Sequence, residues 1–253
     1  MNFENKQIEF NSNGLILRGI ISYSGIKNAP LVIMATGDSK SGSKSGFCKM
    51  LIPKLLDKGI NVFVFDFPGK GISDGDDSLL TVKIGLDSLS DAYNIIMTHD
   101  FYDKSRVGLI GSSFGGLVGI IFLARNKTII KALALKSPSC FYPEVYELWV
   151  GLDGLKQWQA DNYSQITERY WNSYIEGFDY NCFLDAQSIN IPCIIVHGNA
   201  DKTVPVVHTH RLNYCLKGET DILILDGVDH GYKEDNALKV ATDKFSIWFS
   251  SKL

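Results

Sequence analysis

The serine at position 113 lies in a sequence pattern that can turn its hydroxyl into a nucleophile. Residues 111–115 read Gly-Ser-Ser-Phe-Gly and fit the pattern G-x-S-x-G. An apolar run at 107–110 leads directly into this pattern, and apolar residues at helical spacing follow it. This context predicts a sharp strand-to-helix turn that exposes the Ser113 hydroxyl at the N-terminus of a helix.

A second stretch, residues 71–75, fits the same pattern around Ser73. A loop separates Ser73 from the apolar run before it, and two aspartates follow in place of an apolar helix face. We therefore expect Ser113 to be the nucleophile, with its neighbour Ser112 pointing away. The alternative for residues 111–115 is a plain glycine-rich turn without chemistry.

A serine hydroxyl needs a base within hydrogen-bond reach, and that base needs an anion to orient it. His230 follows the apolar run 222–225, in a loop at the predicted carboxyl end of the last strand. We predict that His230 is the base, the alternative being a solvated loop histidine. The other histidines have structural explanations. His99 suits a helix end and His197 a packed or turn position, while His208 and His210 would face different sides of one helix.

Asp201 is the predicted acid. It lies just after the apolar run 193–196, and ligands of open α/β sheets bind at the carboxyl ends of strands. Asp226 and Asp229 are nearer to His230 in the chain. Adjacent side chains on an extended loop point apart, so Asp229 is poorly placed to orient His230.

The elements that would position these side chains alternate along the chain. Near-continuous apolar runs favour strands that are covered on both faces, and the alternating run 15–22 indicates an edge strand. Helical patterns lie between them, which predicts an α/β fold with a doubly wound, mostly parallel sheet. The runs are 31–35, 62–65, 107–110, 132–135, 193–196 and 222–225, and the helical patterns are 45–58, 80–98, 114–126, 206–216 and 236–250.

The alternation stops between about residues 138 and 190. The surrounding stretch 137–192 carries 12 of the 29 aromatic residues of the chain. We predict a small, mostly helical cap insert within one domain that spans residues 1–253. The aromatic side chains could build the core of the insert, line an apolar pocket over the sheet, or do both.

Composition limits the kinds of partner and compartment. The net charge is −3, which gives no positive field for nucleic acid, so we expect a small-molecule partner. Five cysteines without a CxxC motif argue against a disulfide framework or a zinc site and favour reduced thiols in a cytoplasm. We expect neither a secretory signal nor a membrane span. The final residues 251–253, Ser-Lys-Leu, would be a peroxisomal signal only in a eukaryote.

A nucleotide-binding loop is a rival interpretation of the glycine-rich residues 37–46. Gly37 and Gly42 fit G-x-x-x-x-G-K-[ST], but Ser43 takes the place of the lysine and Lys44 comes one residue late. That slip would turn the lysine away from a phosphate, so the spacing argues against this function.

With these motifs together, the chain resembles the α/β-hydrolase superfamily, and most of all its compact acyl esterases of the feruloyl or cinnamoyl esterase and monoglyceride-lipase-like kinds. The order serine, aspartate, histidine along the chain is the order of that superfamily. The likeness is carried by residues 66–75, 111–115, 198–201 with 204–205, and 229–231.

The resemblance implies a serine esterase that needs no metal and no cofactor. It would cleave carboxylic esters through an acyl-enzyme, and the aromatic residues of the predicted cap favour esters with apolar or aromatic acyl or alcohol groups. The backbone N–H groups of Phe114 and Asp38 would hold the oxyanion, although Thr36-Gly37-Asp38 stands where the family usually has His-Gly and an apolar residue. Alternatives are an acyl thioesterase with the same residues and a non-catalytic ligand-binding protein on the same fold.

Overall fold

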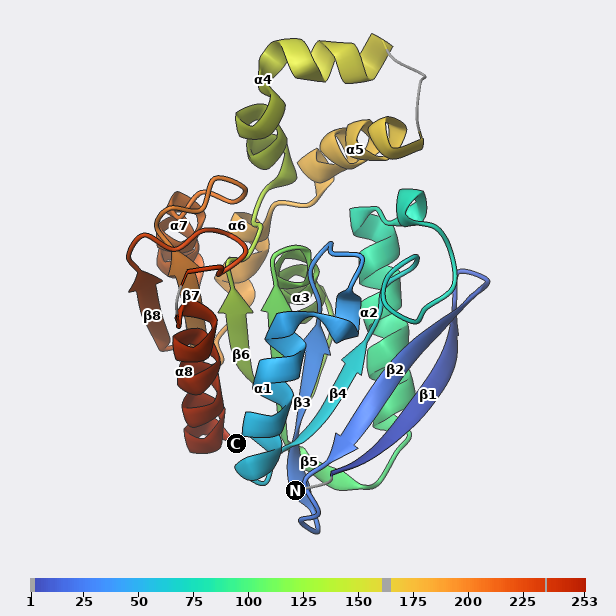
Figure 1. Ribbon diagram of the computed structural model, residues 1–253, viewed down its shortest axis with the longest axis vertical. Helices are drawn as coiled ribbons and strands as arrows, with labels where there is room; N and C mark the ends of the chain where they lie inside the picture. Colours follow the sequence, from blue (N-terminus) through green and yellow to red (C-terminus); the bar gives the residue numbers. More distant parts are fainter. Residues whose placement is uncertain (1–2, 161–164, 235) are drawn as a thin grey trace.

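The computed structural model describes residues 3–160, 165–234 and 236–253. Its strands form one sheet in the order β1-β2-β4-β3-β5-β6-β7-β8 (Figure 1). The strands are β1 Glu4–Ser12, β2 Leu15–Tyr23, β3 Ala29–Ala35, β4 Asn61–Phe65, β5 Tyr102–Ser112, β6 Ile130–Lys136, β7 Cys193–Gly198 and β8 Thr220–Leu225.

Strands β3 to β8 are parallel, while β1 and β2 pair antiparallel at one side of the sheet. The chain passes from β3 to β4 on one side and then returns to β5 on the other side. This reversal makes the crevice between the carboxyl ends of β3 and β5 the expected ligand site of an open α/β sheet. The predicted doubly wound, mostly parallel α/β sheet is confirmed.

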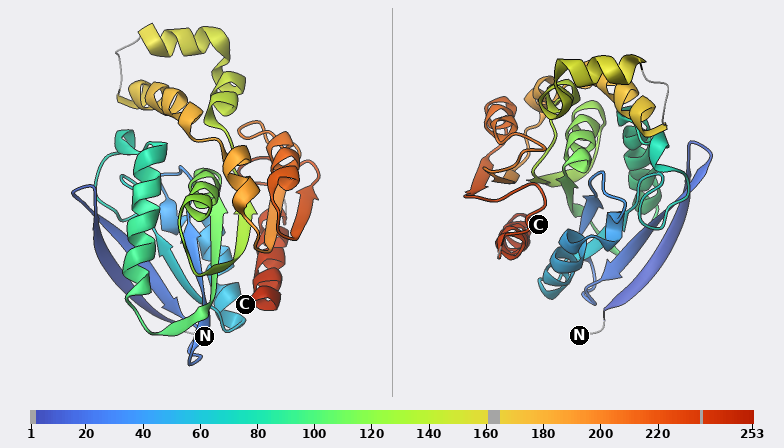
Figure 2. Two further views of the ribbon diagram at one scale, coloured as in Figure 1. Left: turned by 180° about the vertical axis from the view of Figure 1, so that it is seen from behind. Right: turned by 45° about the horizontal axis from the view of Figure 1, so that its top comes forward.

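Helices cover both faces of the sheet (Figures 1 and 2). The apolar sides of α1 and α8 pack on one face, and those of α2 and α3 pack on the other, which gives two buried layers. The helices are α1 Gly46–Asp57, α2 Val82–Met97, α3 Phe114–Arg125, α4 Tyr142–Ala160, α5 Gln165–Glu176, α6 Cys182–Asp185, α7 Val207–Cys215 and α8 Ala237–Lys252.

The prediction that residues 15–22 form an edge strand is wrong. Strand β1 pairs along the whole of β2 and takes the edge position itself. Most side chains of β1 are exposed, and only Ile8 and Phe10 bring large apolar groups to the core. A strand with so few apolar residues shows little alternation of apolar and polar residues in the sequence. Only its backbone pairing with β2 identifies it.

The stretch predicted as a cap insert forms α4, α5 and α6 between β6 and β7. Helices α4 and α5 stand over the carboxyl edge of the sheet, at the top of Figure 1. Gly151, with φ 67° and ψ 173°, kinks α4 into two segments. The cap therefore sits over the edge at which the parallel strands end.

Candidate active site

Ser113 occupies a strained turn between β5 and α3. Its backbone has φ 52° and ψ −112°, a region that non-glycine residues rarely adopt. Close packing enforces the turn, because a Cβ on Gly115 would lie 2.1 Å from the carbonyl oxygen of Ala35. The Ser113 N–H also donates to the carbonyl of Lys136 at 2.9 Å. Strand, loop and helix thus hold the serine in one orientation.

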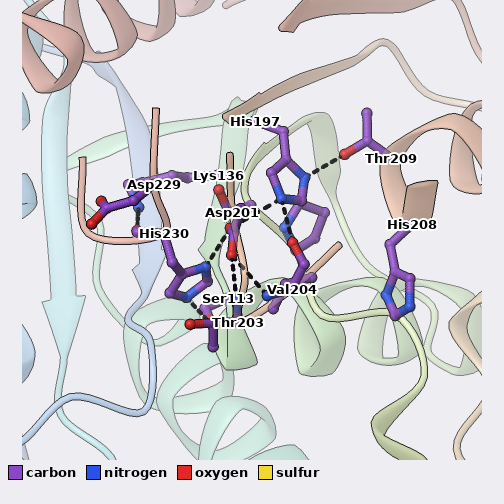
Figure 3. Close-up of polar contacts among 12 residues, drawn as sticks. Ser113, Lys136, His197, Asp201, Thr203, Val204, His208, Thr209, Asp229 and His230 are labelled. Atoms are coloured by element: carbon purple, nitrogen blue, oxygen red, sulfur yellow. Dashed lines mark hydrogen bonds and ion pairs between the residues drawn. The ribbon is translucent and has the colours of Figure 1, made fainter. Parts of the chain in front are cut away.

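The structure brings the three predicted side chains together in one chain of hydrogen bonds (Figure 3). Ser113 Oγ lies 3.0 Å from His230 Nε2, and His230 Nδ1 lies 2.6 Å from Asp201 Oδ2. Because Asp201 accepts from Nδ1–H, Nε2 is left free to accept the hydroxyl proton. This is the geometry that activates a serine nucleophile.

Asp201 is held as an anion by four N–H donors. Its side chain is fully buried. Oδ1 accepts from the backbone N–H groups of Thr203 and Val204 at 2.9 and 2.8 Å, while Oδ2 accepts from the two histidines His230 and His197. Burial by itself would raise the pKa of Asp201, but the hydrogen bonds from His197 and His230 lower that pKa well below its usual range.

The contact of His197 with Asp201 was not anticipated from the sequence, which indicated only a packed or turn histidine. His197 is fully buried, and its Nε2–H lies 3.1 Å from Asp201 Oδ2 and 3.0 Å from the carbonyl of Val204. The Nδ1 atom of the same ring lies 2.7 Å from the Thr209 hydroxyl, so both ring nitrogens have hydrogen-bond partners. The available signal was the position of His197, four residues before Asp201 at the end of β7.

The residues rejected on sequence grounds lie elsewhere. The Ser73 hydroxyl donates to the carbonyl of Asp66 at 2.6 Å and accepts the N–H of Arg18 at 2.9 Å, so it serves loop structure. Asp229 lies in the same loop as His230, but its carboxylate faces Lys233, with Oδ2 3.9 Å from Lys233 Nζ. Neither group joins the hydrogen-bond chain around Ser113.

The two predicted oxyanion donors flank the serine. Gly37 lies directly against Ser113, since a Cβ built on Gly37 would be 3.4 Å from that of Ser113. Among the described residues, the backbone N–H groups of Asp38 and Phe114 have no hydrogen-bond acceptor. The Phe114 ring is buried and packs on Phe67, 5.2 Å between ring centroids, which fixes the position of its backbone.

Two buried cations, Lys70 and Arg169, neutralise the partly exposed carboxylate of Asp38. Lys70 Nζ lies 2.6 Å from Asp38 Oδ1, and the Arg169 guanidinium contacts Oδ2 of the same carboxylate. Both cations also pair with Asp77, and Arg169 donates to the carbonyl of Leu80 at 2.8 Å. The cluster therefore ties the loop after β3 to helix α5 of the cap, a contact that sequence reasoning missed.

A cavity of about 450 Å³ opens onto Ser113 and His230. On the cap side it is walled by aromatic side chains that also pack on one another, such as Tyr146 and Tyr170, whose ring centroids are 5.9 Å apart. These side chains thus have both roles considered for the insert. The cap-side lining comprises Tyr142, Val145, Tyr146, Trp149 and Tyr170.

The glycine-rich loop is occupied by a carboxylate of the chain itself. Asp66 is fully buried, and its Oδ1 accepts the N–H of Ser43 at 2.5 Å. Its Oδ2 accepts the Ser43 hydroxyl at 2.7 Å and the N–H of Ile72 at 3.0 Å. A phosphate would have to compete with this carboxylate, which weighs further against a nucleotide-binding loop.

Residues 3–160, 165–234 and 236–253 contain neither a membrane-spanning helix nor a metal-binding cluster. No helix there combines the length and apolar character needed to cross a membrane. Within the same ranges, no three side chains of histidine, cysteine, aspartate or glutamate are grouped to hold a metal ion.

Comparisons with known proteins agree with this architecture. The family model for the alpha/beta hydrolase fold matches residues 30–171. The protein YfhR of Escherichia coli K12 is 26% identical over 224 residues, covering 87% of this chain and 71% of YfhR. Acylamino-acid-releasing enzyme 1 of Oryza sativa subsp. japonica is 21% identical over 249 residues, covering 92% of this chain but only 31% of that enzyme.

Solved structures match over nearly the whole chain. Est1E from Butyrivibrio proteoclasticus, with ferulic acid bound, superposes with a TM-score of 0.82 at 20% identity, covering 97% of this chain and 98% of Est1E. An esterase from Pyrococcus furiosus gives a TM-score of 0.73 at 20% identity, covering 99% and 91%. Identities this low establish a shared fold only. The family match, which spans more than half of the sequence, shows that this chain belongs to the α/β hydrolase fold family.

Proposed function

We propose that this protein is a serine hydrolase that cleaves carboxylic esters through an acyl-enzyme. The observation that carries the proposal is the hydrogen-bond chain from Ser113 through His230 to Asp201, with the serine in a strained turn. A non-catalytic binding protein would have no need to hold a serine in so costly a conformation beside an oriented imidazole.

In the proposed reaction, Ser113 Oγ attacks the ester carbonyl while His230 Nε2 takes the hydroxyl proton. Asp201 stabilises the resulting imidazolium, and the N–H groups of Phe114 and Asp38 hold the negative oxygen of the tetrahedral intermediate. His230 then protonates the departing alcohol. A water molecule, deprotonated by the same imidazole, attacks the acyl-enzyme and releases the acid.

The cap side of the cavity supports an apolar or aromatic group on the ester. Its lining offers mainly ring faces and aliphatic carbon, which bind apolar groups by removing their surface from water. A thioester carries the same acyl group to the same nucleophile and is the nearest alternative substrate.

The test is a series of 4-nitrophenyl esters of increasing acyl length, with the matching thioesters. Because a serine lacking its hydroxyl cannot form the acyl-enzyme, Ser113→Ala should lower kcat by a factor on the order of 10⁶. Labelling by a fluorophosphonate probe should disappear in the same variant.

The control is Ser73→Ala, which removes the serine of the other G-x-S-x-G match. It should keep its turnover while losing about 1 kcal/mol of stability from two hydrogen bonds. Equal rates for wild type and Ser113→Ala would refute the assignment of the nucleophile. An unlabelled wild type without turnover would favour the non-catalytic alternative.

A further inference from the structure

Lys136 is a buried cation in the wall of the same cavity, beside the rings of Phe47 and Tyr232. It ends β6 and is only 6% exposed. Its Nζ donates to the carbonyl of His230 at 3.3 Å and lies 3.8 Å from the centre of the Tyr232 ring. Figure 3 places it beside His230 and Asp201, and the mechanism proposed above gives it no role.

No carboxylate of the described chain forms an ion pair with Lys136. The nearest polar partner is a neutral carbonyl, and a buried charge of this kind is costly unless it is paired. Burial lowers the pKa of Lys136 from 10.5 to about 8, and attraction by Asp201 and Asp229 offsets only part of this effect. The ammonium thus lacks a counter-charge at contact distance.

The N-terminus of α1 faces the same part of the cavity. Gly46 and Phe47 line it, and their backbone N–H groups have no acceptor within the described part of the chain. The Phe47 ring centre lies 5.8 Å from Lys136 Nζ, so lysine and helix end are neighbours. Free N–H groups and the helix dipole favour an anion at such an end.

We propose that Lys136 and the N-terminus of α1 form a subsite for a carboxylate group of the substrate. The preferred substrates are then esters that carry a free carboxylate on one side of the ester bond. The substrate preference rests on the proposed esterase function. The binding of the anion follows from Lys136 and α1 alone.

A purely structural role of Lys136 makes a different prediction. If the lysine only held the His230 loop through its bond to the carbonyl, its replacement would weaken all ligands alike. Glutamine at position 136 can still donate a hydrogen bond but carries no charge, so Lys136→Gln separates the two roles. Lys233, whose side chain is 83% exposed in the same loop, provides the control for general charge effects.

The binding experiment uses monomethyl and dimethyl esters of succinate, glutarate and adipate, titrated calorimetrically into Ser113→Ala to prevent turnover. The monomethyl ester of the best-fitting length should bind at least about tenfold more tightly than its dimethyl partner. Adding Lys136→Gln should abolish this preference, whereas adding Lys233→Gln should keep it. Equal affinities for the paired esters, or a preference that survives Lys136→Gln, would overturn the subsite.

Hydrolysis of the same esters by the protein with Ser113 intact distinguishes the two proposals. The ratio of kcat/KM for monomethyl over dimethyl esters should fall about tenfold in Lys136→Gln. Loss of both activities in equal proportion would assign Lys136 to the structure of the His230 loop instead. If no ester is hydrolysed at all, the esterase proposal fails, and the binding preference still decides the anion subsite.

Discussion

Asp201 fixes the orientation of the His230 imidazole, because its carboxylate accepts hydrogen bonds from two histidines and two backbone N–H groups. With every oxygen lone pair directed at a fixed donor, the carboxylate has one orientation. It therefore selects the tautomer of His230 that can accept a proton from Ser113.

Replacing Asp201 by asparagine tests this role. The amide can present an N–H to His230, which would favour the wrong tautomer, so kcat should fall by a factor on the order of 10⁴. Ester hydrolysis under saturating substrate is the measurement. Asp229→Asn is the matched control. The Asp229 carboxylate faces Lys233 rather than the His230 ring, so this variant should keep its kcat. A small effect of Asp201→Asn would contradict the role of this carboxylate.

Lys136 should cost the protein stability because its charge is buried without a contacting anion. Its pKa is about 8 in the folded state and 10.5 as a free side chain, so the unfolded state binds the proton more tightly. The penalty is complete below pH 8 and disappears as the pH rises through 10.5. At 1.36 kcal/mol per pKa unit, it amounts to about 3 kcal/mol at most.

The variant Lys136→Met should therefore unfold at a higher denaturant concentration than wild type at pH 7. Its advantage should shrink between pH 8 and pH 10.5, because the wild-type lysine loses its proton and with it the cost of burial. Urea unfolding across this pH range measures the difference. An advantage that stays constant with pH would assign it to packing rather than to charge.

At the scale of elements, the contact between the cap and the sheet sets the position of the loop after β3. Arg169 on α5 reaches Asp38 in that loop, and Lys70 and Asp77 complete the cluster. Asp38 also carries one of the N–H groups assigned to the oxyanion. The seating of the cap and the geometry of the proposed oxyanion site are thereby coupled.

Arg169→Met breaks this coupling and leaves two carboxylates short of a partner. Stability should fall by about 3–5 kcal/mol, as expected when one partner of a buried ion pair is removed. We expect kcat to fall by roughly 10- to 100-fold, because Asp38 shifts and its N–H group stabilises the oxyanion less well. This loss is smaller than that expected when an oxyanion donor is removed completely.

Arg211→Met is the control for the cap contact. Arg211 joins α7 to Glu144 of α4, but its side chain is 45% exposed and does not reach the loop after β3. Its loss should leave kcat within about twofold of wild type, since exposed ion pairs contribute little. A normal kcat in folded Arg169→Met, measured under saturating ester, would refute the coupling.

At the scale of the whole molecule, the two packed layers protect most of the thiols. All five cysteines are free, and Cys48, Cys140, Cys182 and Cys193 are buried, while Cys215 is partly exposed. Burial raises the pKa of Cys48 to about 11 and that of Cys193 to about 12, which keeps these two thiols protonated at neutral pH.

A disulfide reagent should therefore react with one thiol quickly in the folded protein, and with all five after unfolding in guanidinium. The Cys215→Ser variant should lack the fast reaction and release four thiols on unfolding, which is five less one. Fast reaction of two or more thiols in the native state would mean that the sheet layers open more readily than their packing suggests.

The sequence by itself determined the fold class and the candidates for chemistry. Apolar runs indicate buried strands through local composition, and G-x-S-x-G between a strand and a helix indicates a strained turn through local chain geometry. Asp201 and His230 follow from one further rule, that the loops after parallel strands meet at one edge. None of these inferences requires knowledge of which side chains touch.

Tertiary structure alone decided which side chains are paired and which are left without a partner. Arg169 and Asp38 are 131 residues apart, and no local pattern links them. The contact of His197 with Asp201, the edge position of β1 and the burial of Lys136 without an ion pair likewise depend on neighbours across the sheet. Burial and ion pairing are interactions through space, so they become definite only when the chain has packed.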